Sequence, residues 1–396
     1  MKAIKNNIFK LINFCYKLLF GYPNKGENKF LTIKTNSSNG KVRNAAIFYV
    51  FQGVLLYSKD KWNDDSLNSH SMYWESVEMV KILNKYGYDV DYFDCTCTHL
   101  NLDLKKYDLI IDERNNVKNF AFDDQILIYY ATGCHWLTNN QSEYGFIKDF
   151  ADRNSIIVLP ERQITPYDTD LYANYITYFG NDFQVNTFNH SKAKKIPLSI
   201  SSTYEIQHIE RDIEKAKYHF LWIGSRGAIH KGLHIVIDAF CQLPQFHLHI
   251  AAAIENEYEF MQWLNKKIES NANIHNEGWQ NIGSNEFKKI AEKCLGSIYT
   301  SSAEGGAGSI VQLMHFGIIP FVNKTTALRG EHLGIVINGE KPSEQTQNIV
   351  ENLLYFESLN SDLLQDWSNK ITGFAKKHHT RKSYSESFEY LITQLQ

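Results

Sequence analysis

Short apolar runs alternate with longer amphipathic stretches along most of the chain. Between the first two runs, residues 70–86 place Trp74, Val77, Val80 and Leu83 on one face of a helix. Apolar runs that are separated by helices predict a buried parallel sheet. In the first half of the chain, the runs of strand length cover residues 45–51, 88–94, 107–112, 126–131, 155–159 and 175–180.

A second alternation begins after residues 181–217, which lose this regularity and are expected to connect two domains. Two successive α/β series predict two Rossmann-like domains that face each other across a cleft. Residues 28–42 are polar and indicate either a linker or a short hairpin. In the second series we expect strands at 219–224, 246–252, 273–279, 296–301 and 318–322, and helices at 231–243, 255–269, 284–294 and near 308–316.

Length and composition agree with a globular protein of two domains. The chain has 396 residues, 43% of them hydrophobic, and a net charge of −3, which gives no reason to expect a nucleic-acid partner. Its six cysteines are scattered through mostly apolar runs, as in a protein of a reducing compartment, so we expect a cytoplasmic location. Cys95 and Cys97 lack the second cysteine or histidine pair that a zinc site needs.

The first twenty residues place Ile and Leu side chains at helical spacing, with four lysines between them. They lack the unbroken apolar core and the cleavage site of a signal peptide. The sequence also has no run of about 18 uncharged apolar residues that could span a membrane. Two interpretations stay open: a basic amphipathic helix that lies on an anionic membrane surface, or a helix that packs on the protein itself.

The segment 220–240 carries the strongest local pattern. An expected strand ends at Gly224, a loop with Arg226 and Lys231 follows, and Gly232 opens a helix. Cations beside a helix N-terminus favour an anionic ligand, for which a diphosphate is the natural candidate. The alternative is an ordinary strand–helix turn with two solvated cations. The segment matches neither a Walker loop nor the Gly-x-Gly-x-x-Gly pattern.

The segment 301–322 carries the second pattern. Glu304 precedes a small-residue turn that leads into an apolar helix. The free amides of such a turn bind phosphate oxygens, and a neighbouring carboxylate accepts hydrogen bonds from sugar hydroxyls. Glycine-rich turns before helices are also common without any ligand. The turn consists of Gly305, Gly306, Ala307, Gly308 and Ser309.

Together, the two segments resemble the donor site of the family-4 glycosyltransferases, which have the GT-B fold. The resemblance extends from about Tyr218 to the C-terminus, including 331–340 and a last helix near 379–395, and is diffuse over the N-terminal half. Together with the residue patterns, it divides the chain into four expected segments: an amphipathic helix (1–27), an acceptor domain (28–205), a nucleotide-sugar domain (206–375), and a C-terminal helix that returns to the first domain (376–396).

The resemblance also implies roles for individual residues. Arg226 and Lys231 would hold the donor diphosphate, and Glu304 would contact the donor sugar. The residues 305–309 would lie along sugar and phosphate. Gly224, at the strand end before the cationic loop, would also bind the donor. Gln312 stands where the family usually has a glutamate that binds the ribose, so the charge is lost there. Gly278 and Trp279 resemble the loop beside the nucleobase, although a tryptophan can equally belong to the core.

In the N-terminal half the family places a glycine-containing loop after the first strand and often a histidine on the acceptor side. Gln52-Gly53 fits the loop, which makes Gly53 a donor-binding candidate. His135, just after a strand end, is the candidate catalytic histidine, and His70 is a weaker one; a lone histidine is also often structural. Glu161 and Arg162 are polar residues at another strand end, without an assigned role.

We expect neither a metal nor a cofactor at the donor site. Asp89-Val90-Asp91 and Asp168-Thr169-Asp170 have the Asp-x-Asp spacing that GT-A enzymes use for a metal. That spacing arises easily by chance in a chain with 44 acidic residues. Cations and helix amides can neutralise a leaving diphosphate instead.

The expected function is therefore a retaining, metal-independent glycosyltransferase that uses a nucleoside-diphosphate sugar. Its acceptor would be a glycan or a lipid-linked glycan, as in the assembly of surface polysaccharides on the inner face of the membrane. Two alternatives stay open. One is a GT-B nucleotide-sugar epimerase or phosphorylase. The other is a non-catalytic protein that binds a sugar nucleotide or a partner, which the Gln312 departure suggests.

Overall fold

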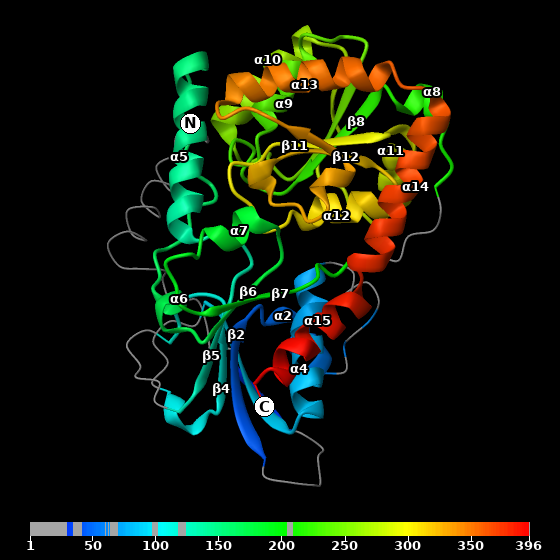
Figure 1. Ribbon diagram of the computed structural model, residues 1–396. Helices are drawn as coiled ribbons and strands as arrows, with labels where there is room; N and C mark the ends of the chain where they lie inside the picture. Colours follow the sequence, from blue (N-terminus) through cyan, green and yellow to red (C-terminus); the bar gives the residue numbers. More distant parts are fainter. Residues whose placement is uncertain are drawn as a thin grey trace.

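The computed structural model describes residues 30–34, 42–59, 61, 63, 70–96, 102–117, 124–203 and 209–395. Within these ranges the chain forms two α/β units, drawn one above the other in Figure 1. The expected helix over 1–27 and its membrane contact lie outside them. No helix in the described ranges is both long enough and apolar enough to cross a bilayer.

The first unit contains a seven-stranded sheet in the order β1-β3-β2-β4-β5-β6-β7. All its pairings are parallel except that of β1 with β3, which is antiparallel and forms one edge. Within the polar segment 28–42, the described residues Phe30–Ile33 form this edge strand. The strands are β1 (Phe30–Ile33), β2 (Arg43–Tyr49), β3 (Tyr88–Asp94), β4 (Leu109–Asp112), β5 (Ile126–Tyr130), β6 (Tyr175–Tyr178) and β7 (Lys194–Pro197).

Both faces of this sheet are buried because alternate side chains of each strand point to opposite sides. Ile47 and Val90 belong to one apolar core, and Phe48 and Phe93 belong to the other. Buried faces on both sides explain why the strands appear in the sequence as continuous apolar runs. The helices are α2 (Gln52–Ser58), α4 (Ser71–Lys85), α5 (Trp136–Asn154), α6 (Thr169–Tyr172) and α7 (Asp182–Asn186), with a 3-10 turn η1 (Leu104–Lys106).

The second unit contains a six-stranded, fully parallel sheet in the order β10-β9-β8-β11-β12-β13. Its strands are β8 (His219–Gly224), β9 (His247–Ala252), β10 (Ile274–Asn276), β11 (Gly296–Tyr299), β12 (Ile319–Asn323) and β13 (Ile335–Ile337). Its helices are α8 (Ile213–Ala216), α9 (Leu233–Phe240), α10 (Tyr258–Ser270), α11 (Asn285–Lys293), α12 (Gly308–His315), α13 (Pro342–Glu357) and α14 (Ser361–His378), with 3-10 turns η2 (Lys324–Thr326) and η3 (Glu331–Leu333). The predicted α/β class with two parallel sheets is confirmed.

The last helix, α15 (Arg381–Thr393), lies beside α4 of the first unit (Figure 1). Ser385 donates a hydrogen bond to Glu78 on α4 at 2.7 Å, and Glu389 pairs with Lys85. The Tyr384 and Tyr130 hydroxyls are 2.8 Å apart inside the core. The chain therefore returns to the first unit after it completes the second.

Three expectations for the first unit are wrong. Residues 181–217, expected to connect the two domains, contain α7 and the edge strand β7 of the first sheet. Residues 155–159 form no strand, since β5 pairs directly with β6, and the side chains of Ile157 and Leu159 are exposed. Gly53 lies inside α2 rather than in a loop. A Cβ at Gly53 would overlap the carbonyl of Tyr73, so this glycine lets α2 pack closely on α4 and does not face a ligand.

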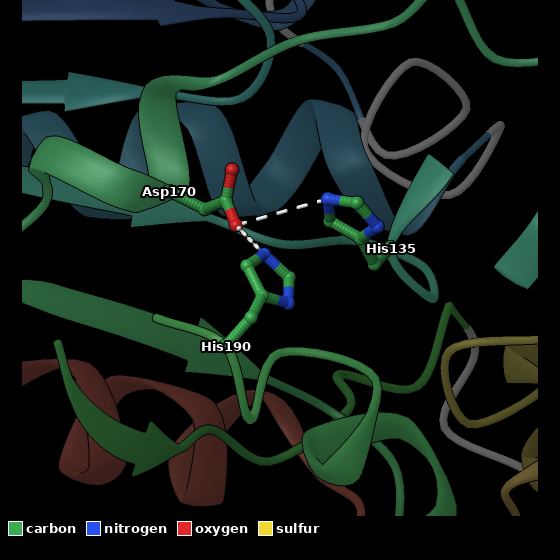
Figure 2. A group of neighbouring side chains, drawn as sticks. All are labelled: His135, Asp170 and His190. Carbon is green, nitrogen blue, oxygen red and sulfur yellow. Dashed lines mark hydrogen bonds and ion pairs between the residues drawn. The ribbon is translucent and has the colours of Figure 1, made fainter. Parts of the chain in front are cut away.

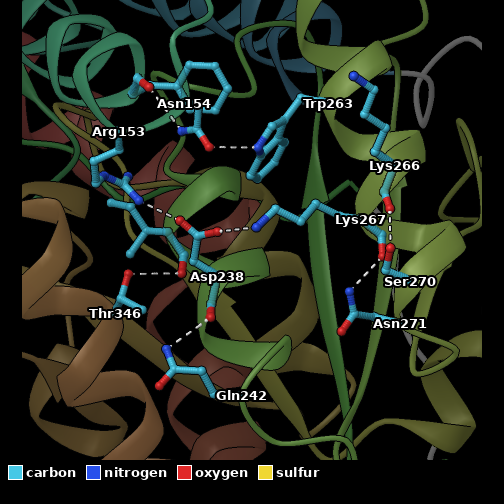
Figure 3. Close-up of polar contacts among 12 residues, drawn as sticks. Arg153, Asn154, Asp238, Gln242, Trp263, Lys266, Lys267, Ser270, Asn271 and Thr346 are labelled. Atoms are coloured by element: carbon cyan, nitrogen blue, oxygen red, sulfur yellow. Dashed lines mark hydrogen bonds and ion pairs between the residues drawn. The ribbon is translucent and has the colours of Figure 1, made fainter.

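Helix α5 extends from the first unit and packs against the second. Phe150 is fully buried, with its ring 5.2 Å from Trp263 of α10 and 5.6 Å from His234 of α9. Around this contact, Arg153 of α5 pairs with Asp238 at 2.5 Å, and Asp238 also pairs with Lys267 at 3.0 Å (Figure 3). This apolar contact with its polar border ties the two units together.

Removing the Phe150 side chain tests this contact. We expect Phe150→Ala to lower the free energy of unfolding by about 3–5 kcal/mol, because it leaves a cavity between α5, α9 and α10. Tyr144→Ala, on the exposed side of the same helix, should change it by no more than about 0.5 kcal/mol. Urea unfolding of both variants measures the difference. Equal, small effects would show that α5 does not dock on the second unit.

Candidate functional site

The turn between β8 and α9 holds the predicted cations. Gly232 has φ +72°, and a Cβ there would overlap the Thr300 carbonyl, so only glycine lets this turn pass the end of β11. Lys231 is buried, and its Nζ donates to the Ser225 hydroxyl at 3.0 Å. Arg226 is exposed, and its Nε lies 3.3 Å from Glu161 of the first unit.

The turn between β11 and α12 holds the predicted carboxylate. Glu304 is half-buried, and its Oε1 accepts a hydrogen bond from the Tyr299 hydroxyl at 2.9 Å. Gly306 and Ala307 both have positive φ, and α12 begins at Gly308. The turn therefore directs the first amides of α12 towards the same edge of the sheet as Lys231, since β8 and β11 are parallel neighbours.

The charges of Lys231 and Glu304 depend on each other. Burial lowers the pKa of Lys231 to about 8, although the charge of Glu304 opposes this shift. Burial alone would raise the pKa of Glu304, but the charges of Lys231 and Arg162 and the hydrogen bond from Tyr299 hold it below its ordinary value. Both groups are thus charged at neutral pH, in surroundings where charge interactions are stronger than in water.

Two further residues of this site were not predicted from the sequence. His230 is buried and joins the two turns, since its Nε2 donates to the Ala303 carbonyl at 2.8 Å and its Nδ1 accepts from Ser302 at 3.1 Å. The carboxylate of Glu257 accepts the amide of Gly227 at 2.6 Å and that of Ala228 at 3.0 Å, and burial raises its pKa to about 7. His230 could have been suspected because it precedes Lys231, but no sequence pattern connects Glu257 with this turn.

Residues of the first unit contact both turns. A Cβ at Gly305 would overlap the carbonyl of Thr132, so this glycine allows the two backbones to touch. The Cys134 thiol donates to the Glu304 carbonyl at 3.0 Å. On the other turn, the Arg162 side chain lies against Gly227, where a Cβ would lie 2.5 Å from the Arg162 Cγ.

Arg162 is held in place by the polar side of α5. The buried carboxylate of Glu143 accepts the amides of Glu161 and Arg162, both at 2.9 Å. Asn139 donates to the Arg162 carbonyl at 2.8 Å. The guanidinium contributes a positive charge that acts on both Lys231 and Glu304. Sequence analysis named Arg162 without a role; the structure brings it to the cationic turn.

The two candidate histidines cap helices. His70 Nδ1 accepts the Met72 amide at 3.2 Å at the start of α4, and His135 Nδ1 accepts the Leu137 amide at 3.3 Å at the start of α5. His135 directly follows Cys134 and so stands beside the Glu304 turn, but its ring faces Asp170 and His190 instead. Burial lowers the pKa of His135.

The remaining candidates lie along the second sheet. Gly224 ends β8 beside the Trp222 ring and the Lys231 side chain. Gly278 has φ +65° and accepts the Ala252 amide after β10, and Trp279 next to it is 65% exposed, which rules out a place in the core. Gln312 is buried, and its Oε1 accepts the amide of Thr203 in the connection between the units at 2.8 Å.

A pocket of about 780 Å³ lies between the two units. Gly180 on its wall also contacts Gly306 of the carboxylate turn, which places the pocket beside the predicted sugar position. Arg329, also on the wall, donates to the carbonyls of Leu198 and Gly180, both at 3.2 Å. The pocket is lined by Tyr178, Gly180, Asn181, Asp182, Phe183, Asn186, Pro197, Lys324, Arg329 and Glu331.

No protein-family model matches this sequence. No curated protein gives a significant match either.

Solved structures, in contrast, match it over nearly its whole length. Sucrose-phosphate synthase from Thermosynechococcus elongatus has a TM-score of 0.58 at 10% identity, over 89% of this chain and 99% of that protein. HepE from Anabaena, solved with UDP and glucose, has a TM-score of 0.52 at 12% identity over 89% and 99%. WaaG, a glycosyltransferase involved in lipopolysaccharide biosynthesis, has a TM-score of 0.52 at 11% identity over 88% and 99%.

Longer proteins match over only part of their length. The chain spans 54% of TarM and 57% of the matched chain of the GtfA/B complex. With two parallel sheets that meet at their strand ends, and with nearly full-length matches of this kind, the chain has the GT-B fold.

Proposed function

We propose that this protein is a glycosyltransferase that moves a sugar from a nucleoside-diphosphate sugar to a glycan or lipid-linked acceptor. The observation that carries the proposal is the position of Lys231 and Glu304 after the neighbouring strands β8 and β11, beside the start of α12, where the charge of each acts on the other. A buried ammonium and a helix N-terminus suit a diphosphate, and a fixed carboxylate suits sugar hydroxyls. The UDP and glucose bound by HepE, which has the same fold, support this choice.

In this proposal three cations receive the diphosphate. Lys231 and Arg226 contact its oxygens from the second unit, and Arg162 completes the group from the first unit. The backbone of Gly308 and Ser309 adds the positive end of α12. These groups stabilise the leaving diphosphate as its charge develops, so the chemical step at this site needs no metal ion. Retention of the anomeric configuration is proposed from the family resemblance.

The other proposed contacts with the donor come from the turn after β11, from α12 and from the loop after β10. Glu304, with Gly305, Gly306 and Ala307 beside it, contacts the donor sugar. Gln312 contacts the ribose through its amide group. Gly278 and exposed Trp279 lie beside the nucleobase, where an indole can stack on the ring.

The proposed setting is the assembly of a surface polysaccharide at the cytoplasmic face of a membrane. WaaG, which shares the fold, is involved in lipopolysaccharide biosynthesis and supports this setting. The four lysines of the first twenty residues would supply contact with an anionic surface. The pocket of about 780 Å³ beside Gly306 is large enough for an acceptor sugar.

A nucleotide-sugar panel, with Glu304→Gln and Gln312→Glu as variants, tests the proposal. Binding is followed by thermal shift and turnover by release of nucleoside diphosphate. Glu304→Gln keeps the size but removes the charge, and should lower turnover about 10- to 100-fold. Gln312→Glu restores the family residue and should keep activity, since a carboxylate still accepts the Thr203 amide.

An indifferent Glu304 together with an inactivated Gln312→Glu would mean that this turn is not the donor site. Sugar-nucleotide binding without any turnover, in the wild type and both variants alike, would instead favour a non-catalytic binding protein.

Nucleotide affinity should depend on pH through Lys231. Its pKa of about 8 means that the ammonium loses its proton above pH 8, so affinity should fall by up to about tenfold per pH unit there. In Lys231→Arg the cation stays charged and the alkaline decrease should disappear, even if affinity at pH 7 is lower. Calorimetric titration of UDP from pH 7 to 9.5 measures this. The same alkaline decrease in Lys231→Arg would assign it to another group.

Arg162 should contribute to diphosphate binding although it belongs to the first unit. We expect Arg162→Ala to weaken UDP about tenfold or more, since a charge-assisted contact contributes about 1.5–3 kcal/mol. Uridine, which lacks the diphosphate, should bind equally well to both proteins. Lys148→Ala removes an exposed cation from α5 and is the matched control. An equal loss for uridine and UDP would indicate that Arg162 only supports the fold.

A further inference from the structure

Three side chains from separate segments of the first unit converge on one point (Figure 2). Asp170 Oδ2 lies 2.6 Å from His190 Nε2 and 3.8 Å from His135 Nε2. The three ligand-type atoms all lie within 4.8 Å of one another. His135 stands at the start of α5, Asp170 on α6, and His190 on the turn after α7, so the cluster arises only in the folded chain.

Two aspartates of the α6 segment each have one buried carboxylate oxygen without a hydrogen-bond donor among the described residues. Asp170 is completely buried, and its Oδ1 accepts no hydrogen bond from any residue in the described ranges. The Oδ1 of Asp168, at the N-terminal end of the same short helix, is also buried without a donor there. Among the described residues no lysine or arginine forms an ion pair with either aspartate. A buried acceptor without a partner is costly, and a cation would offset that cost.

We propose that His135, Asp170 and His190 bind a divalent cation of the zinc type. Two imidazole nitrogens and one carboxylate oxygen form a ligand set that suits zinc and its neighbours in the first transition row. The side chains of His135 and Asp170 are 10% and 1% exposed, whereas that of His190 is 41% exposed. The ion therefore has two fixed ligands, a third at the surface, and a solvent side from which it enters and binds water.

Binding of the ion changes which ring nitrogen of each histidine carries the proton. The ion takes the place of the proton between His190 Nε2 and Asp170 Oδ2, and His190 then carries its proton on Nδ1. His135 likewise offers Nε2 and carries its proton on Nδ1, which gives up the bond from the Leu137 amide. That bond is 3.3 Å long, so its loss costs little. Each imidazole stays neutral, since its proton moves from Nε2 to Nδ1 and is not released.

The bound ion would stabilise one wall of the GT-B cleft. It would connect the start of α5 with α6 and with the turn after α7. Cys134, next to His135, contacts the Glu304 carbonyl, so the ion would also fix the loop that touches the carboxylate turn. Its role is structural and separate from the donor chemistry, and the proposal does not depend on the proposed transferase activity.

A second group of histidines provides a matched control. His219, His247, His249 and His275 stack across β8, β9 and β10, with two nitrogen pairs at 3.0 Å. In the described ranges, however, no three ligand atoms of this stack come together as those of the His135 cluster do. The stack can bind an ion through two imidazoles at most, and we expect it to bind zinc more weakly.

Zinc titration of the full-length protein tests the proposal. The protein is first freed of metal with a chelator and then titrated against a chromophoric zinc indicator. We expect about one tight equivalent, which His190→Gln and Asp170→Asn lose and the control His275→Gln keeps. Co²⁺ in place of zinc should give the visible absorption of a four-coordinate site, which is also lost in His190→Gln. Zinc should raise the Tm of the wild type and His275→Gln by several degrees, and that of His190→Gln by less.

If Asp170→Asn fails to fold, His190→Gln still tests the proposal, because His190 is half-exposed and its replacement should leave the fold intact. Circular dichroism checks the fold of each variant. Tight zinc binding that survives His190→Gln, or that disappears in His275→Gln alone, would overturn the proposal. So would the absence of tight binding in the wild type.

Discussion

The contact between the Glu304 turn and the first unit is the constraint on which the arrangement of the site depends. Three groups of Glu304 are held at once. Its carboxylate accepts the Tyr299 hydroxyl, its amide donates to the Thr325 carbonyl, and its carbonyl accepts the Cys134 thiol. Gly305 makes this possible because a side chain there would strike the Thr132 carbonyl. The position of the carboxylate is therefore set by both units, and the site is complete only when they are in contact.

Helix α5 couples this contact to the cationic turn. Its apolar side packs Phe150 against α9 and α10, and its polar side holds the backbone of Glu161 and Arg162 through Glu143. The same helix thus fixes the distance between the units and the place of Arg162. An interface of this kind, with an aromatic centre and an ion-paired border, resists separation more than a short polar hinge would. Motions that change the distance between the units must then be small, or must move α5 together with the second unit.

The sequence predicts the sheets well because most strands are buried on both faces and appear as continuous apolar runs. The bounds of 88–94 and 219–224 were predicted to the residue, whereas the apolar side chains of 155–159 lie exposed on a surface segment. An apolar run indicates burial only where a neighbouring strand is present, and that depends on tertiary structure. The GT-B fold could be predicted because two segments resemble the donor site of the family-4 glycosyltransferases. His70 and His135 each stand at a helix start, and in the structure each caps its helix through Nδ1. Their place on the acceptor side stays a prediction.

The sequence could not predict how the charges of the site balance one another. Three cations, Arg162, Arg226 and Lys231, share the site with Glu161, Glu257 and Glu304. The Arg226–Glu161 pair is exposed enough that breaking it costs little, so Arg226 is free to exchange its carboxylate for a phosphate. Buried Lys231 keeps Glu304 beside it, and separating these charges would leave a buried group uncompensated. An entering anion would therefore reorganise the exposed half of the site and leave the buried half in place.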